Sequence, residues 1–149
     1  MNDNNSDATG RILQRLSVER PEVRYISRNT PPNGFGFAVR AGLAAFAGDV
    51  VAIVMADQSD LPEDVVRFYR KLQKGYDCVF GTRFGPGSGV LDYRWLKRIL
   101  NRLGNTFIQI LFLLRYNGVT NAFKLYRRAV IAGVQPLLAY HFNLTVEIP

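Results

Sequence analysis

The chain of 149 residues has only one cysteine and one histidine, and this scarcity narrows its chemistry. A single cysteine can form neither a disulfide framework nor a cysteine-based zinc site, which indicates a reducing cytoplasmic compartment. Cys78 lies in the apolar run 76–80, where we expect an inert core thiol. His141 has no carboxylate or serine at a spacing typical of catalysis, so we do not expect it to be a catalytic group.

Long apolar runs and acidic residues are also scarce. No stretch approaches the roughly 20 apolar residues of a membrane-spanning helix. The longest one, 107–114, is interrupted by Gln109. The polar start of the chain is not typical of a signal peptide. The 19 basic and 12 acidic residues give a net charge of +7, which favours an anionic partner: nucleic acid, a phosphorylated substrate or an anionic membrane surface.

The chain does contain an alternation of helix and strand patterns. Apolar, β-branched runs predict strands at 23–26, 50–55 and 78–81, of which 50–55 is expected to be a central parallel strand. Helical spacing and capping residues predict helices after Ser6 or Asp7, at 37–47, between Asp60 and Gly75, and at 94–115. This order predicts an α/β fold with a mostly parallel sheet flanked by helices, as one partial domain over 1–149.

Two carboxylates follow the most apolar predicted strand. Asp57 and Asp60 come directly after the run 50–55, and open α/β sheets bind their ligands at the carboxyl ends of their strands. In one interpretation, Asp57 ligates Mg²⁺ or Mn²⁺ that bridges a diphosphate, and Asp60 assists it. In the other, both are strand-end and helix-capping residues, a common use of aspartate, and the pattern alone favours this second interpretation.

Arginines that could bind phosphate follow the third predicted strand and begin the long helix. Arg83 lies on the same predicted sheet edge as the two carboxylates, where its guanidinium could form two hydrogen bonds with a phosphate. Arg98 lies among basic residues that lead into the apolar run 107–114. The alternatives are a solvated loop arginine and a solvated helix face. A basic segment followed by an apolar one suits a phosphorylated lipid at a membrane surface.

Six short segments occur in an informative order along the chain. They are 2–9, like D-D-G-S-x-D-x-T; 34–42, like G-x-G-x-A-x-R-x-G; 55–64, like D-A-D followed by P-E-D; 81–84, like G-S/T-R-F; 95–98, a helix start with an arginine; and 119–128, like x-T-S/N-G/A-F-K/R-x-Y-R-R. In this order they resemble family 2 glycosyltransferases of the dolichol- or polyprenyl-phosphate mannosyltransferase type. The resemblance covers nearly the whole chain.

The resemblance implies a nucleotide-diphospho-sugar transferase (Rossmann-like) fold. It also implies inverting, metal-assisted transfer of a sugar from a GDP- or UDP-linked donor to a polyprenyl or dolichyl phosphate. The protein would be peripheral at the cytoplasmic face of the membrane, with Mg²⁺ or Mn²⁺ as cofactor. Donor binding is implied for Asp3, Gly34, Arg40 and Asp57. Catalysis is implied for Asp57, Arg83 and Arg98, the acceptor phosphate for Arg83 and Arg98, and the metal for Asp57 and Asp60.

The chain departs from the family pattern at Met55 and Gly118, where the family usually has aspartates. The family's first strands precede the first matching segment, so we expect a sheet that lacks them, in a domain truncated at both ends. These departures leave a second hypothesis, a catalytically inactive remnant that retains only phosphate- and lipid-binding elements. A third, a nucleic-acid-binding domain, is disfavoured because the aromatic residues lie within apolar runs instead of between basic residues.

Overall fold

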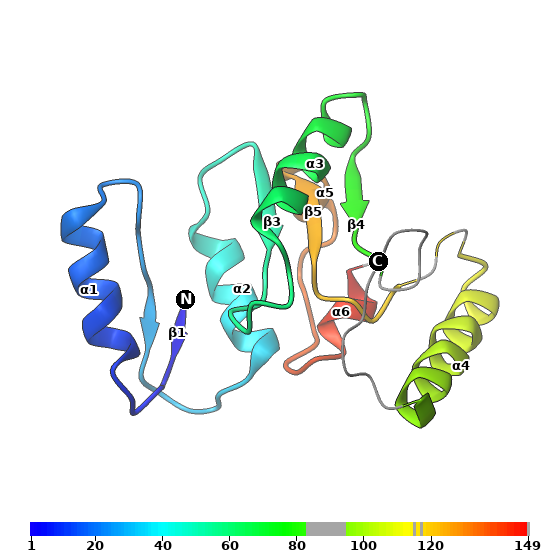
Figure 1. Ribbon diagram of the computed structural model, residues 1–149, viewed down its shortest axis with the longest axis horizontal. Coiled ribbons are helices and arrows are strands. Elements are labelled where there is room, and N and C mark those ends of the chain that lie inside the picture. The colour runs from blue at the N-terminus through cyan, green and yellow to red at the C-terminus, as the bar shows by residue number, and fades with distance from the viewer. Residues whose placement is uncertain (83–94, 115, 117, 149) are drawn as a thin grey trace. The chain divides into compact units, whose positions relative to one another are not determined.

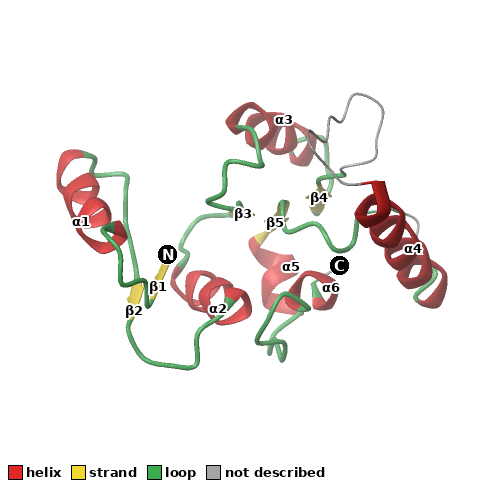
Figure 2. Ribbon diagram, turned by 60° about the horizontal axis from the view of Figure 1, so that its bottom comes forward, coloured by secondary structure: helices red, strands yellow, loops and turns green. Residues whose placement is uncertain are grey.

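The computed structural model describes residues 1–82, 95–114, 116 and 118–148. Figures 1 and 2 label its helices and strands. The chain forms two compact units. One comprises Met1–Gly48 with Pro136–Glu147, and the other comprises Asp49–Gln135 with Ile148–Pro149. We describe each unit by itself.

The first unit begins with a small parallel sheet. Strand β1 (Asn2–Asp3) pairs with β2 (Ser27–Arg28), and helix α1 (Thr9–Glu19) connects the two strands. Helix α2 (Phe35–Ala45) follows, and α6 (Leu144–Glu147) completes the unit. The expected strand at 23–26 was wrong. Residues 27–28 form the strand instead, because they pair with β1. The polar start of the chain gave no sign that β1 would form.

At the start of α1, Ala8 occupies the N-cap position and no side chain caps it, so the expectation that Ser6 or Asp7 caps this helix was wrong. The side chain of Asp7 accepts a hydrogen bond from the N–H of Thr9 at 2.9 Å. Hydrogen bonds from Thr9 lower the pKa of Asp7, because they stabilise the ionised carboxylate. This contact satisfies one of the backbone donors that a helix leaves open at its beginning.

The second unit is built on a three-stranded sheet in the order β3-β5-β4. Strands β3 (Val50–Ile53) and β4 (Cys78–Phe80) both pair antiparallel with β5 (Lys124–Arg127). The predictions of a mostly parallel sheet and of a central parallel strand at 50–55 were therefore wrong for this unit. The reason is the insertion of β5 between the other two strands. Its short sequence Lys-Leu-Tyr-Arg begins and ends with charge and gave no strand signal.

The helices of the second unit are α3 (Pro62–Leu72), α4 (Trp95–Leu111) and α5 (Arg128–Gly133), drawn in red in Figure 2. The predicted helices between Asp60 and Gly75 and at 94–115 are confirmed as α3 and α4. Helix α3 packs on the sheet through a buried cluster. Its members are Leu72, Val79, Phe123 and Leu125, with Val50, Val65 and Phe68 against them. The rings of Phe68 and Phe123 stack with their centroids 4.6 Å apart.

Strand β5 also has a buried polar face. Lys124 and Tyr126 point to the side opposite Leu125, as the two-residue period of a strand requires. The Lys124 Nζ and the Tyr126 hydroxyl both donate hydrogen bonds to the carbonyl of Ile148, at 2.8 and 2.9 Å. Burial lowers the pKa of Lys124 to about 8 and raises the pKa of Tyr126. These bonds fasten residue 148 to the centre of the sheet.

Helix α4 carries a large apolar surface that the described part of its unit leaves exposed. The exposed apolar side chains of α4 and the two residues after it are Ile99, Leu100, Leu103, Phe107, Ile110, Leu111, Phe112 and Leu113. In contrast, the polar residue Asn105 of the same helix is buried, with an exposure of 1%. Within the described ranges, no helix has the length and apolar composition that crossing a membrane requires.

Candidate functional site

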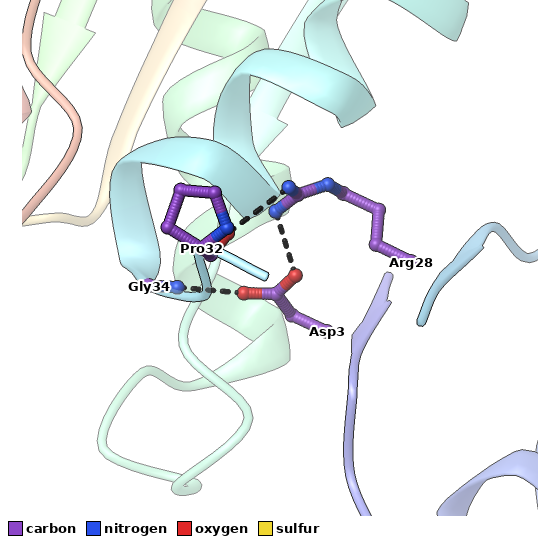
Figure 3. Close-up of polar contacts among 4 residues, drawn as sticks. All are labelled: Asp3, Arg28, Pro32 and Gly34. Carbon is purple, nitrogen blue, oxygen red and sulfur yellow. Dashed lines mark hydrogen bonds and ion pairs between the residues drawn. The ribbon is translucent and has the colours of Figure 1, made fainter. Parts of the chain in front are cut away.

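The first unit contains a polar network around Asp3, at the end of β1 (Figure 3). One carboxylate oxygen of Asp3 accepts a hydrogen bond from the N–H of Gly34 at 2.8 Å. The other accepts one from Arg28 Nη1 at 2.7 Å, and both side chains of this ion pair are largely buried. Arg28 also donates to the carbonyl of Pro32 at 3.1 Å. The network therefore ties β1 and β2 to the residue that precedes α2.

Gly34 is required at this position by its backbone. Its φ of +149° lies in the region that favours glycine, and a Cβ there would lie 3.2 Å from His141 Nδ1. The N–H of Gly34 is directed at Asp3, so the sharp turn delivers the amide to the carboxylate. The structure thus brings together two of the predicted donor-binding residues, Asp3 and Gly34.

The third of these residues, Arg40, lies on α2 and contacts an aromatic ring. Its Cζ atom lies 4.9 Å from the centroid of the Tyr140 ring. Tyr140 in turn stacks on Phe37 at 4.8 Å, and the Arg28 guanidinium lies 5.1 Å from the Phe37 centroid. Arg28 has Asp3 as its counter-ion. Arg40, in contrast, has a buried Nη1 atom with no hydrogen-bond partner in the part of the chain that the structure describes.

The segment that carries Tyr140 approaches α2 very closely at Gly36. A Cβ at Gly36 would lie 2.4 Å from the carbonyl carbon of Tyr140 and 2.8 Å from the backbone nitrogen of His141. Only a residue without a side chain permits this approach. Sequence reasoning missed Tyr140 altogether and gave Gly36 no role beyond its place in the segment 34–42. The spacing of Gly34 and Gly36 could have indicated this contact, because glycines often occur where another part of the backbone approaches closely.

The fourth predicted donor-binding residue, Asp57, lies in the second unit, in the loop after β3. Its Oδ1 atom accepts a hydrogen bond from the N–H of Ser59 at 3.0 Å. Asp60, in the same loop, accepts one from the N–H of Met55 at 3.2 Å. The expectation that Asp60 caps α3 was wrong, because Leu61 occupies the N-cap position and the Asp60 carboxylate turns back toward β3.

These two carboxylates are a small ligand set for a metal. The described part of the chain contains no group of three or more histidine, cysteine, aspartate or glutamate side chains that could hold an ion. Mg²⁺ commonly takes one or two carboxylates from a protein and completes its shell with substrate phosphates and water. Asp57 and Asp60 therefore fit a metal that is held jointly with a diphosphate, although both also have the backbone contacts of ordinary loop aspartates.

The two predicted phosphate-binding arginines are placed to different extents. Arg83 lies outside the described residues. The loop that leads to it starts at Gly81, whose carbonyl accepts a hydrogen bond from Asn121 Nδ2 at 3.0 Å. Arg98 lies near the start of α4, where the open backbone donors of a helix favour anions.

The fold places the chain among α/β proteins, and comparisons with known sequences assign it further. Residues 1–134 match the glycosyl transferase family 2 model, and the chain belongs to this family. It is 28% identical over 137 residues to the polyprenol monophosphomannose synthase of Mycolicibacterium smegmatis, covering 90% of this chain and 52% of that protein. It is 25% identical over 137 residues to the undecaprenyl-phosphate mannosyltransferase of Micrococcus luteus, covering 90% and 56%. The chain thus spans about half the length of these curated relatives.

Family membership confirms the resemblance to family 2 glycosyltransferases, and it implies the nucleotide-diphospho-sugar transferase fold. The sheets of this chain are nevertheless small and partly antiparallel. The roles of the individual site residues, the metal and the single partial domain stay predictions.

Proposed function

We propose that this chain is the catalytic part of a glycosyltransferase that moves a sugar from a nucleotide-sugar donor to a polyprenyl or dolichyl phosphate. The donor is a GDP- or UDP-linked sugar, and transfer inverts the anomeric centre. Family membership supports the reaction class. The names of both relatives combine mannose with a polyprenol or undecaprenyl phosphate, which supports this type of acceptor.

The observation that carries the proposal is that three predicted donor-binding residues lie in the first unit and two of them are hydrogen-bonded to each other. Asp3 binds the amide of Gly34, and Gly34 immediately precedes the helix that carries Arg40. Arg40 retains a buried Nη1 atom with no hydrogen-bond partner among the described residues. A half-buried arginine with an unsatisfied donor favours an anionic ligand, and the diphosphate of a nucleotide sugar is such a ligand.

In the second unit, Asp57 and Asp60 would hold Mg²⁺ or Mn²⁺ with a phosphate as a further ligand. A metal ion bound there supplies positive charge that offsets the charge of the leaving diphosphate. Arg83 and Arg98 would bind the acceptor phosphate and orient its oxygen toward the sugar. This oxygen is already anionic, so the reaction needs no strong general base.

Helix α4 would lie at the membrane surface where the lipid acceptor resides. It combines the basic residues Lys97, Arg98 and Arg102 with the exposed apolar side chains described above and contains no acidic residue. Such a helix inserts its apolar face at the level of the headgroups while its basic residues meet anionic phosphates. The chain would therefore act as a peripheral protein at the cytoplasmic face of the membrane.

The experiment that tests the proposal is a titration of the chain with GDP and with UDP, in the presence and absence of Mn²⁺. We expect one of the two nucleotides to bind. In Mn²⁺, Asp57→Asn should bind it at least about tenfold more weakly than the wild type, because the cation loses a carboxylate ligand. Asp64→Asn is the matched control, since Asp64 lies on α3 and pairs with Arg67 at 2.9 Å. Unchanged Mn²⁺ dependence in Asp57→Asn would place the metal elsewhere.

The second candidate is a catalytically inactive remnant that retains phosphate- and lipid-binding elements. One observation favours it. Gly118, which stands where the family usually has an aspartate, has a φ of +109°, and a Cβ there would lie 3.0 Å from the Gly81 carbonyl oxygen. The local backbone is thus adapted to glycine and not to a carboxylate. Failure of the folded chain to bind either nucleotide with Mn²⁺ would favour this candidate.

A further inference from the structure

Tyr140 lies beyond residues 1–134, which match the family, yet it contacts two residues of α2, the helix that Gly34 precedes. We propose that Tyr140 is a positioning residue that holds the Arg40 guanidinium in the orientation that binds the donor diphosphate. The inference rests on the proposed function, since it takes Arg40 to be a donor-binding residue. It adds a residue from the segment Pro136–Glu147, to which neither the sequence motifs nor the family match assigns a role.

The contacts of the Tyr140 ring explain how it would orient the arginine. Phe37 and Arg40 are three residues apart on α2 and share a helix face. The Tyr140 ring stacks on Phe37 with an interplanar angle of 19° and lies 4.9 Å from the Arg40 Cζ atom. Stacking on Phe37 fixes the plane of the ring. A guanidinium is attracted to the face of such a ring, and the Tyr140 ring is partly exposed at 50%.

The backbone of Tyr140 is itself held in place, as positioning requires. The carbonyl carbon of Tyr140 lies so close to α2 that only glycine fits at position 36. Both oxygens of the Glu147 carboxylate accept hydrogen bonds from consecutive amides, those of Leu138 and Ala139. Leu137 and Leu144 are buried on either side of this turn, with exposures of 2% and 1%. The ring is thus presented from a segment that is anchored at several points.

Arg28 and Arg40, which contact the stacked rings of Phe37 and Tyr140, differ in their polar partners. Arg28, beside Phe37, is neutralised by Asp3 at 2.7 Å and donates to a backbone carbonyl. The Nη1 atom of Arg40, beside Tyr140, is buried and has no hydrogen-bond partner among the described residues. Arg28 therefore serves the network around Asp3. Arg40 has a hydrogen-bond donor that a phosphate can satisfy.

The test compares nucleotide affinity in five variants of the chain, with the nucleoside diphosphate that the wild type binds, in Mn²⁺. Tyr140→Leu should weaken binding about five- to tenfold, because it removes the ring face from Arg40. Tyr140→Phe keeps the ring and should stay within about twofold of the wild type. Phe142→Leu is the matched control, since Phe142 lies on the same segment and packs on Phe35 at 5.0 Å. It should leave the affinity unchanged. Tyr140→Leu combined with Arg40→Gln should bind no more weakly than Arg40→Gln alone.

Pentafluorophenylalanine at position 140 keeps the size of the ring but reverses the charge of its face, and it keeps the test decisive if Tyr140→Leu does not fold. It should weaken binding as Tyr140→Leu does. If neither the leucine nor the fluorinated variant weakens binding, the proposed role of Tyr140 is overturned, while the proposed function is unaffected. A loss that persists in the Arg40→Gln background also overturns it. A folded wild type that binds neither GDP nor UDP overturns the proposed function and the role of Tyr140 with it.

Discussion

Asn105 of α4 and Thr120 form reciprocal hydrogen bonds. The Asn105 Nδ2 atom donates to the Thr120 hydroxyl at 3.1 Å, and the N–H of Thr120 donates to Asn105 Oδ1 at 3.2 Å. Asn105 is 1% exposed on a helix whose other described side chains are largely exposed and apolar. Thr120 precedes Asn121, which binds the Gly81 carbonyl. The pair therefore fastens α4 to Thr120, next to the residue that binds the end of β4 at Gly81.

Asn105→Ala should destabilise the chain by about 1–3 kcal/mol, because it leaves the amide of Thr120 without its partner in a half-buried position. Thr106→Ala is the matched control on the same helix. Thr106 is exposed, and alanine has the higher helix propensity, so this variant should be as stable as the wild type. Urea unfolding followed by circular dichroism measures both. Equal midpoints for the two variants would show that the Asn105–Thr120 pair contributes nothing to stability.

Two glycines of α2 should respond in opposite ways to the same substitution. Gly36→Ala places a methyl group 2.4 Å from the Tyr140 carbonyl carbon, and the segment must move, at a cost of about 1–3 kcal/mol. Gly42→Ala meets nothing within 4 Å and should stabilise the helix by about 0.5–1 kcal/mol. Thermal unfolding of both variants checks this. A stable Gly36→Ala variant would contradict the close approach of Tyr140 to α2.

Arg98→Ala should weaken the interaction with the acceptor lipid and leave the donor unaffected, because a charge-assisted hydrogen bond to phosphate contributes about 1.5–3 kcal/mol. The measurement is co-flotation with vesicles that contain polyprenyl phosphate, alongside a titration with GDP or UDP. We expect about a tenfold or greater loss in vesicle binding. Arg67→Ala, an exposed arginine on α3, is the control and should change neither. Equal losses for lipid and nucleotide would remove the acceptor role from Arg98.

The parts of the fold that the sequence predicted are those with a local cause. Pro62 begins α3 with two acidic residues in its first turn, and these features were read correctly. Strands β1 and β5 were not predicted, because they form only by pairing with residues far away in the sequence. Lys124 of β5 resembles a surface residue in the sequence. It is buried because the Ile148 carbonyl accepts a hydrogen bond from its amine.

In the candidate site, too, the sequence did not predict contacts between residues that are distant along the chain. Asp3, Gly34 and Arg40 were predicted from the resemblance, and the structure adds how Asp3 and Gly34 meet. Asp60 was read as a helix cap, because an aspartate just before Pro62 is typical of one. The sequence could not reveal that the amide of Met55 competes for this carboxylate. Tyr140 was out of reach for a different reason, since only the folded backbone brings it to α2.

Lys124 gives the chain a pH dependence whose sign follows from its lowered pKa. In the folded chain the amine loses its proton at about pH 8, whereas an unfolded lysine keeps it to about pH 10.5. Between these values the unfolded state binds more protons, so stability rises with pH, by at most about 1.4 kcal/mol per pH unit. The raised pKa of Cys78 acts in the opposite direction above its ordinary value of 9.0, so the useful range ends near pH 9.

Urea unfolding at pH 7.5, 8.2 and 9.0 should therefore show increasing stability for the wild type and none of this increase for Lys124→Met. The methionine keeps most of the apolar stem, and the Tyr126 hydroxyl still donates to the Ile148 carbonyl, so we expect the variant to fold. Lys74→Met is the control, because Lys74 is exposed after α3, and it should retain the increase of the wild type. A Lys124→Met variant whose stability rises as steeply as that of the wild type would show that another group binds the proton.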